Sequence, residues 1–139
     1  MAGAVYLADT TLYVLRGQVP SVRRRMEGLI AEGRLAMCQM TALEVLNNAP
    51  NPQAYENTRR ALQGQRWIDV TSEAMDRAME VHHDLAKRSQ HRNFKLPDLI
   101  IAATAAVHGA TVLHYDADYD RIAAVTKQPM EWVAERGSL

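Results

Sequence analysis

The stretch LPDLIIAATAAVHGATVLHYDAD, residues 96–118, contains the strongest structural signals in the chain. Its first half, residues 97–108, is nearly all apolar and rich in alanine, which predicts a buried helix that ends at Gly109. Residues 111–115 follow as a short β-rich apolar run, which predicts a strand. A buried helix that leads directly into a buried strand is typical of an α/β domain with a largely parallel sheet.

The same alternation of short apolar runs and longer helical patterns continues through the rest of the chain. Further strands are expected over residues 4–8, 35–40, 67–70 and 130–133. Further helices are expected over residues 11–16, 20–33, 41–47, 51–64, 71–89 and 118–126. No linker, internal repeat or low-complexity segment interrupts the pattern. We therefore expect about five strands in one mainly parallel sheet.

The composition is that of one compact domain. The chain has 139 residues, of which 47% are hydrophobic and 23% charged, with a single cysteine. A domain of this size buries roughly 70% of the surface of its unfolded chain, so it folds without disulfides or a structural metal. Cys38 lies in an apolar run, which predicts a buried residue and fits a reducing compartment. Sixteen Lys and Arg balance sixteen Asp and Glu, which argues against non-specific coating of nucleic acid.

The sequence contains no recognisable targeting or membrane segment. The first residues lack a basic region and reach Asp9 too early for the apolar part of a signal peptide. The uncharged residues 99–115 are divided by His108 and Gly109, which argues against a membrane span. We therefore expect a cytoplasmic protein with no membrane partner. Phosphate-binding glycine loops, an HExxH zinc motif and a GxSxG nucleophile motif are also absent.

Acidic residues follow the predicted strands. Asp9 comes directly after the first strand, and Glu44 lies in the first turn of the helix after the second. Asp98 begins the apolar helix, and Asp116 and Asp118 follow the fourth strand. Because the carboxyl ends of parallel strands share one edge, these side chains are expected to meet there. Carboxylates gathered in this way repel one another unless a cation lies between them, and oxygen ligands favour Mg²⁺ or Mn²⁺.

Each acid also has a purely structural explanation. Asp9 has the right place for a helix N-cap, and Glu44 is spaced to form a capping box with Thr41. Asp98 suits the positive end of a helix dipole, and residues 116–120 have the composition of a solvated turn. The residues alone leave these alternatives open.

Four segments of the chain together resemble the PIN-domain ribonucleases of the VapC toxin type. The matching segments are residues 7–11, 41–46, 96–104 and 113–122. They occur in the family's order and cover almost the whole chain. The resemblance implies a three-layer α/β/α sandwich, formed by a single PIN domain of residues 1–139.

The resemblance also implies which residues form the active site. The implied metal ligands are Asp9, Glu44, Asp98 and Asp118, around one or two Mg²⁺ or Mn²⁺ ions. Asp116 is expected to assist as a further catalytic residue. Thr10 or Thr11 is expected to form a hydrogen bond within the site, and the family often has serine where Thr11 stands. Tyr119 stands where phenylalanine is commoner.

The implied activity is metal-dependent endonucleolytic hydrolysis of RNA, which leaves a 5′-phosphate and a 3′-hydroxyl and arrests translation and growth. The implied partners are the RNA substrate, a VapB-like antitoxin and a second copy of the chain in a homodimer. The apolar side chains of Met26 and Leu29 are candidates either for the dimer contact or for the core.

An acidic site that acts on RNA requires basic residues around it. The segment of residues 87–95 contains four cations and no acid, and it leads directly to Asp98. The expected RNA-binding residues are Lys87, Arg88, Arg92 and Lys95. Phe94 in the same segment is expected to pack against the sheet, with base stacking as the alternative.

Two other functions compete with this interpretation. A catalytically silent PIN-like module that binds RNA or protein would have lost one or more of the acids, and none is lost here. An Asp-dependent phosphoryl-transfer domain also places an aspartate after its first strand. However, a phosphatase would have a second aspartate where Thr11 stands. A receiver domain would have one after the third strand, whereas Asp69 is predicted to lie within that strand.

Overall fold

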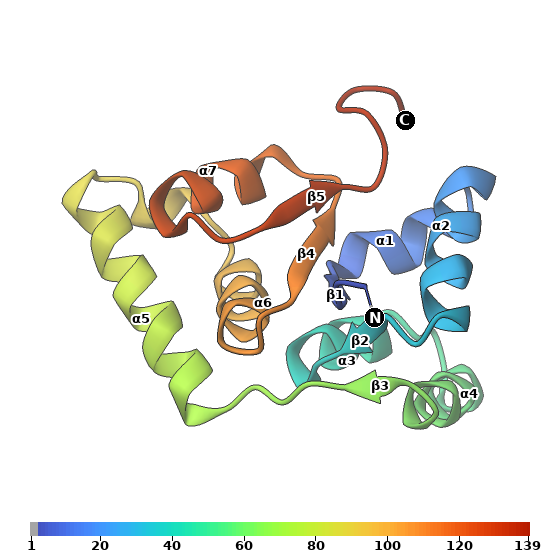
Figure 1. The fold of residues 1–139 in the computed structure, drawn as a ribbon. Helices are drawn as coiled ribbons and strands as arrows, with labels where there is room; N and C mark the ends of the chain where they lie inside the picture. Colours follow the sequence, from blue (N-terminus) through green and yellow to red (C-terminus); the bar gives the residue numbers. More distant parts are fainter. Residues whose placement is uncertain (1–2) are drawn as a thin grey trace.

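The chain forms one parallel sheet with the strand order β3-β2-β1-β4-β5 (Figure 1). This computed structural model describes residues 3–139. Met1 and Ala2, which begin the predicted N-terminal segment, lie outside the described residues. The strands are β1 (Tyr6–Ala8), β2 (Leu35–Met37), β3 (Arg66–Trp67), β4 (Thr111–His114) and β5 (Met130–Trp132). The mainly parallel sheet of five strands that the sequence predicts is thereby confirmed.

Helices connect all of these strands. In chain order they are α1 (Thr10–Leu15), α2 (Pro20–Ala31), α3 (Gln39–Asn47), α4 (Pro52–Gln63), α5 (Ser72–Lys87), α6 (Leu96–Val107) and α7 (Ala117–Thr126), with a short 3₁₀ helix η1 (His91–Asn93) before α6. Among residues 3–139, no helix is long and apolar enough to cross a membrane.

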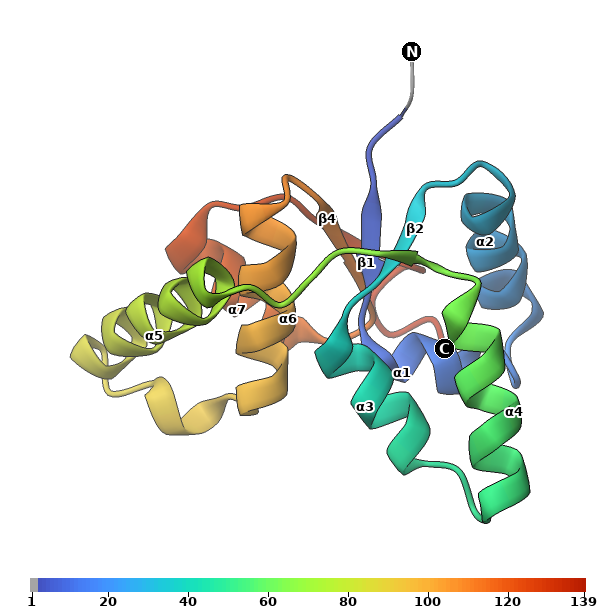
Figure 2. The same ribbon diagram turned by 90° about the horizontal axis from the view of Figure 1, so that it is seen from below.

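Alternating side chains of the strands build two cores, one on each face of the sheet. Leu7 and Val112 point to one face, where they pack with apolar residues of α5, α6 and α7. Tyr6 and Leu113 point to the other face and pack against α1 and α2. Figure 2 shows α5, α6 and α7 on one side of the central strands and α2 on the other. The chain therefore forms the expected α/β/α sandwich.

Helix α6 lies at the centre of the first core. Seven of its twelve residues are buried, including Ile101 and Ala105, which are fully inaccessible to solvent. Gly109 follows the helix with φ +68°, a left-handed conformation that glycine adopts without strain. The turn brings the chain directly into β4, as predicted from residues 96–118. Phe94 and Cys38 are also buried in this core, so the packing prediction is confirmed for both.

Three boundaries differ from the sequence prediction in ways that matter for the site. Strand β2 ends at Met37, and α3 begins at Gln39, two residues before the predicted Thr41. Strand β3 ends at Trp67, so Asp69 follows this strand instead of lying within it. Because β3 is an edge strand, Asp69 lies at the edge of the sheet, where its carboxylate accepts a hydrogen bond from Gln39. The central position that a receiver domain requires is therefore not filled by Asp69.

Candidate active site

The strand order places a topological switch point between β1 and β4. The chain runs from β1 outward through β2 and β3, and then returns to β4 on the other side of β1. Asp9 follows β1 and Asp116 follows β4. These two strands are direct neighbours, because Ala8 is paired with Leu113. Ligand sites of open α/β sheets occur at such a switch point, beyond the carboxyl ends of the strands.

Tyr119 links the acids of two elements at this point. Its hydroxyl lies 2.7 Å from Oδ1 of Asp9 and 3.3 Å from Oδ1 of Asp98. Both carboxylates are buried, with exposures of 4% and 7%, and Tyr119 is fully buried. Burial, followed by the charges of the two aspartates, raises the pKa of the Tyr119 hydroxyl well above its usual value. The hydroxyl therefore remains protonated and is available as a donor.

Asp98 also lies close to the acids that follow β4. One carboxylate oxygen each from Asp98, Asp116 and Asp118 lie within 4.8 Å of one another. Asp9 and Glu44 are not members of this group, although Asp9 connects to it through Tyr119. The site therefore consists of a close trio of aspartates with Asp9 beside it.

The charges in this trio are only partly balanced by basic side chains, because Arg121 pairs with Asp118 and leaves Asp98 and Asp116 without an ion pair among the described residues. The pKa of the Asp98 carboxyl is raised to about 7, mainly by burial and then by the nearby Asp9 and Asp116 carboxylates. The Tyr119 hydrogen bond and the positive charge of Lys95 oppose this rise in pKa without cancelling it. Like charges that are held together with only partial compensation fit a divalent cation, and a donor set made only of carboxylates fits a hard one.

The structural explanations for the acids hold in two cases of four, and one of these is Asp98, which lies in the first turn of α6. Asp9 precedes α1, but its side chain makes no capping hydrogen bond. Glu44 lies in the second turn of α3, so the predicted capping box with Thr41 is wrong. Asp116 does cap α7, because its carboxylate accepts a hydrogen bond from the Asp118 backbone N–H at 2.8 Å. That bond uses Oδ1 of Asp116, and it also fixes the turn on which Asp118 is carried.

Glu44 has a different partner from the one predicted. The Thr10 hydroxyl donates a hydrogen bond to Oε1 of Glu44 at 2.6 Å, which joins the start of α1 to α3. The resemblance implied a hydrogen bond within the site from either Thr10 or Thr11, and in the structure Thr10 makes this bond to Glu44. Thr11 is exposed, one residue further along α1.

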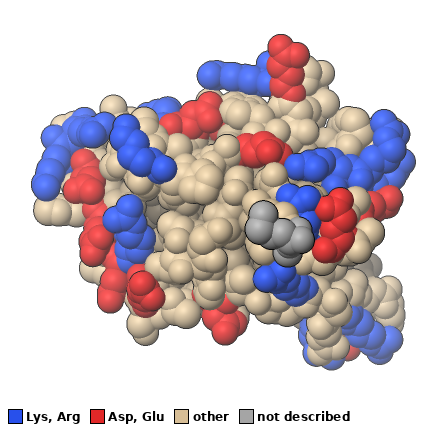
Figure 3. All heavy atoms as spheres, viewed as in Figure 1, with Lys and Arg blue, Asp and Glu red and all other residues tan. Residues whose placement is uncertain are grey.

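The predicted basic residues lie along the approach to Asp98. Arg88, Arg92 and Lys95 are exposed, and Lys87 lies 3.7 Å from Asp84. Figure 3 shows Lys and Arg side chains gathered near the α5 end of the molecule, where this segment begins. The basic segment leads directly into the first turn of α6, which carries Asp98, and the charge of Lys95 acts on the Asp98 carboxyl.

Arg121 connects the basic segment to the acids, and the sequence analysis did not single it out. Its guanidinium lies 4.8 Å from the centre of the Phe94 ring and pairs with the Asp118 carboxylate at 3.1 Å. The only sequence signal is the i, i+3 spacing from Asp118, which is common on exposed helices.

His114 is a further residue whose place was not predicted in detail. It is fully buried at the end of β4, and its Nδ1 accepts a hydrogen bond from the Asp116 backbone N–H at 3.2 Å. Burial lowers the pKa of the imidazole, which keeps it neutral and able to accept this bond. His114 therefore supports the turn at Asp116.

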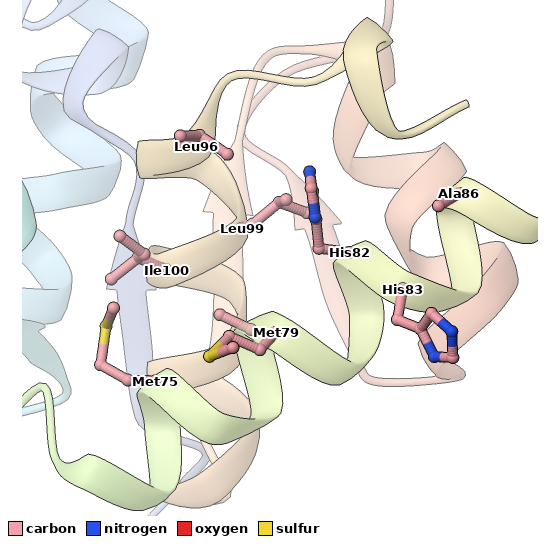
Figure 4. Close-up of a pocket in the computed structure, with 9 residues that line it drawn as sticks. Met75, Met79, His82, His83, Ala86, Leu96, Leu99 and Ile100 are labelled. Atoms are coloured by element: carbon pink, nitrogen blue, oxygen red, sulfur yellow. The ribbon is translucent and has the colours of Figure 1, made fainter. Parts of the chain in front are cut away.

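An apolar groove lies between α5 and α6 on the same side of the sheet. Figure 4 shows Met75, Met79 and His82 of α5 facing Leu96 and Ile100 of α6. No carboxylate lines this groove among the described residues, so the candidate metal chemistry belongs to the acids at the sheet edge.

The fold and the acids at the switch point define the class of protein. A parallel sheet in this order, with aspartates directly after β1, in the first turn of α6 and in the β4–α7 turn, is the architecture expected of a PIN domain. The family model for the PIN domain matches residues 10–125, and the chain belongs to the PIN domain family.

Relatives within this family are named as VapC proteins. Ribonuclease VapC51 of Mycobacterium tuberculosis is 43% identical over 134 residues, which cover 96% of each chain. Ribonuclease VapC21 of the same species is 40% identical over 139 residues, covering 93% of this chain and 99% of its own.

Solved structures confirm the fold at low sequence identity. The DNA-bound VapBC structure from Salmonella typhimurium has a TM-score of 0.73 at 17% identity and covers 95% of this chain and 100% of its own. VapBC2 from Rickettsia felis, bound to a promoter DNA fragment, has a TM-score of 0.75 at 17% identity, covering 92% and 98%.

Proposed function

We propose that the chain is an endoribonuclease of the VapC type that hydrolyses RNA with a divalent cation, Mg²⁺ or its substitute Mn²⁺. The observation that carries the proposal is the convergence of Asp98, Asp116 and Asp118 at the switch point, in a chain whose relatives are named ribonucleases. The cut leaves a 5′-phosphate and a 3′-hydroxyl, and its result in the cell is arrest of translation and growth.

The proposed roles of the side chains follow from their contacts. Asp9, Asp98 and Asp118 hold the cation, with Asp116 and Glu44 as further carboxylates of the site. A divalent cation bound there supplies a water of lowered pKa and neutralises charge that develops on the phosphate. Thr10 orients Glu44 through its hydrogen bond.

The proposed partner is a VapB-like antitoxin. The structural neighbours from Salmonella and Rickettsia are VapBC proteins, and another neighbour, from Klebsiella pneumoniae, is a toxin-antitoxin complex. We place this chain in a system of the same kind, as one PIN domain of residues 1–139 acting in the cytoplasm.

The homodimer stays a prediction. Met26 and Leu29, which the sequence offered for the dimer contact or the core, have exposures of 0% and 1% and belong to the core. In the groove of Figure 4, by contrast, Met79 is 70% exposed and Leu96 is 61% exposed.

The proposed activity is tested by incubating the purified protein with end-labelled RNA and either Mg²⁺, Mn²⁺ or EDTA. We expect internal cleavage with each metal, products that carry a 5′-phosphate, and no cleavage in EDTA. Binding of RNA without cleavage under all metal conditions would contradict the enzyme and favour the silent RNA-binding module.

The basic segment is tested by a double substitution, Arg88→Gln with Arg92→Gln. Each guanidinium that contacts a phosphate contributes about 0.7 to the slope of log affinity against log salt for a single strand, so the slope should fall by about 1.4. The measurement is a fluorescence-anisotropy titration of RNA at several salt concentrations, in Ca²⁺ or EDTA to limit cleavage.

The matched control for this pair is Arg59→Gln with Arg60→Gln on α4. Both arginines pair with Glu56 on an exposed helix face, so they already have a partner within the protein. The control should retain the wild-type slope. Equal slopes for the Arg88/Arg92 variant and wild type would remove this segment from the RNA-binding surface.

A further inference from the structure

We propose that Tyr119 is a positioning residue of the metal site: its buried hydroxyl ties Asp9 to Asp98 through one oxygen of each carboxylate and so holds both for the cation. The inference rests on the proposed function for the identity of the metal site. It goes beyond that function because it gives a role to a hydroxyl that does not itself belong to the carboxylate ligands.

The first support is the lack of another anchor for Asp9. Its side chain does not cap α1, and among residues 3–139 its hydrogen bond comes from Tyr119. The two residues are 110 positions apart, so this contact fixes the carboxyl end of β1 relative to α7. The orientation of a buried carboxylate therefore depends on a single hydroxyl.

The second support is the rigidity of the tyrosine itself. Tyr119 is fully buried among residues of the first core, including Leu99 and Ile122. Its ring also lies against the His114 imidazole, with a distance of 5.0 Å between ring centres. A ring that is packed on these sides holds its hydroxyl at one place, which is what a positioning group requires.

The third support is that the Tyr119 hydroxyl contacts only one oxygen of each carboxylate. It lies near Oδ1 of Asp9 and Oδ1 of Asp98, so the second oxygen of each carboxylate remains available. Asp98 is also the member of the aspartate trio that connects to Asp9. Hydrogen bonds that orient ligating carboxylates typically contribute 10- to 100-fold to metal affinity.

The test compares Tyr119→Phe with wild type by titration with Mn²⁺, with the free ion quantified by electron paramagnetic resonance. We expect the dissociation constant for Mn²⁺ to rise about tenfold, while circular dichroism shows an intact fold. In RNA cleavage, the Mn²⁺ concentration for half-maximal rate should rise similarly, with the rate at saturating Mn²⁺ close to wild type.

The matched control is Tyr115→Phe, which removes a hydroxyl whose bond is to the Leu139 backbone N–H. It should bind Mn²⁺ as wild type does. Unchanged Mn²⁺ affinity in Tyr119→Phe, or an equal loss in both variants, would overturn the positioning role. A wild-type protein that binds Mn²⁺ but cleaves no RNA would contradict the proposed function and leave the Tyr119 inference standing, because the affinity is measured without RNA.

Discussion

Asp98→Asn is expected to lower RNA cleavage by about a thousandfold while making the metal-free protein more stable at pH 8. The loss of activity follows because a bound cation contributes several kcal/mol to the transition state, and each factor of ten corresponds to about 1.4 kcal/mol. The gain in stability follows because asparagine has nearly the shape of aspartate without the charge that the buried site disfavours.

The sign of the stability change follows from the pKa of Asp98, which is about 7 in the folded protein. The unfolded chain gives up this proton near pH 4, so the folded state retains it over the interval between the two values. The free energy of unfolding therefore falls as pH rises from 4 to 7, and the full cost is present above 7. With residual solvent contact reducing the effect, we expect Asp98→Asn to gain about 2 kcal/mol at pH 8.

This prediction is checked by urea unfolding in EDTA at pH 5 and pH 8, beside the cleavage assay. Asp76→Asn is the matched control, since Asp76 is exposed on α5 and the same chemical change should leave both stability and activity unaltered. An Asp98→Asn protein that cleaves RNA like wild type, or that is less stable than wild type at pH 8 without metal, would contradict the account.

The second large effect is stabilisation by the metal itself. A cation that binds only the folded state at a hundred times its dissociation constant adds about 2.7 kcal/mol to the free energy of unfolding. For a domain of this size the corresponding rise in melting temperature is about 8 °C. We expect this rise with Mn²⁺ at pH 8 for the wild type, measured by differential scanning calorimetry.

The same shift should shrink sharply at pH 5 and in Asp98→Asn. A pH of 5 lies below the pKa of the Asp98 carboxyl, which is about 7, so this group holds a proton that Mn²⁺ must displace. Asp76→Asn should keep the full shift. A rise in melting temperature that is the same in Asp98→Asn as in wild type would place the metal elsewhere on the protein.

The elements and the acids were predictable because their signals are local. The apolar run of α6, Gly109 and the β4 strand are contiguous in sequence, and the rule for parallel strand ends then brings Asp9, Asp98 and Asp116 together. This prediction requires only that the strands are parallel, and all four neighbouring pairs of strands are parallel in the structure.

The contacts that were missed depend on long-range packing. Glu44 was assigned a cap because Thr41 resembled a helix start, but α3 begins at Gln39 and its N-cap Cys38 makes no side-chain cap bond. The bond from Tyr119 to Asp9 and the stacking of Arg121 on Phe94 join residues far apart in sequence. No periodicity or spacing encodes such pairs, because they arise only when the helices dock on the sheet.

The central claim is that the acids at the sheet edge carry metal-dependent hydrolysis of RNA. Its most direct test measures the cleavage rate of one end-labelled RNA by wild type, Asp9→Ala and the control Asp76→Ala, at saturating Mn²⁺. The three proteins are first matched for folding by circular dichroism. We predict that Asp76→Ala cleaves at the wild-type rate and that Asp9→Ala is slower by about a thousandfold. Equal rates for Asp9→Ala and wild type would contradict the account.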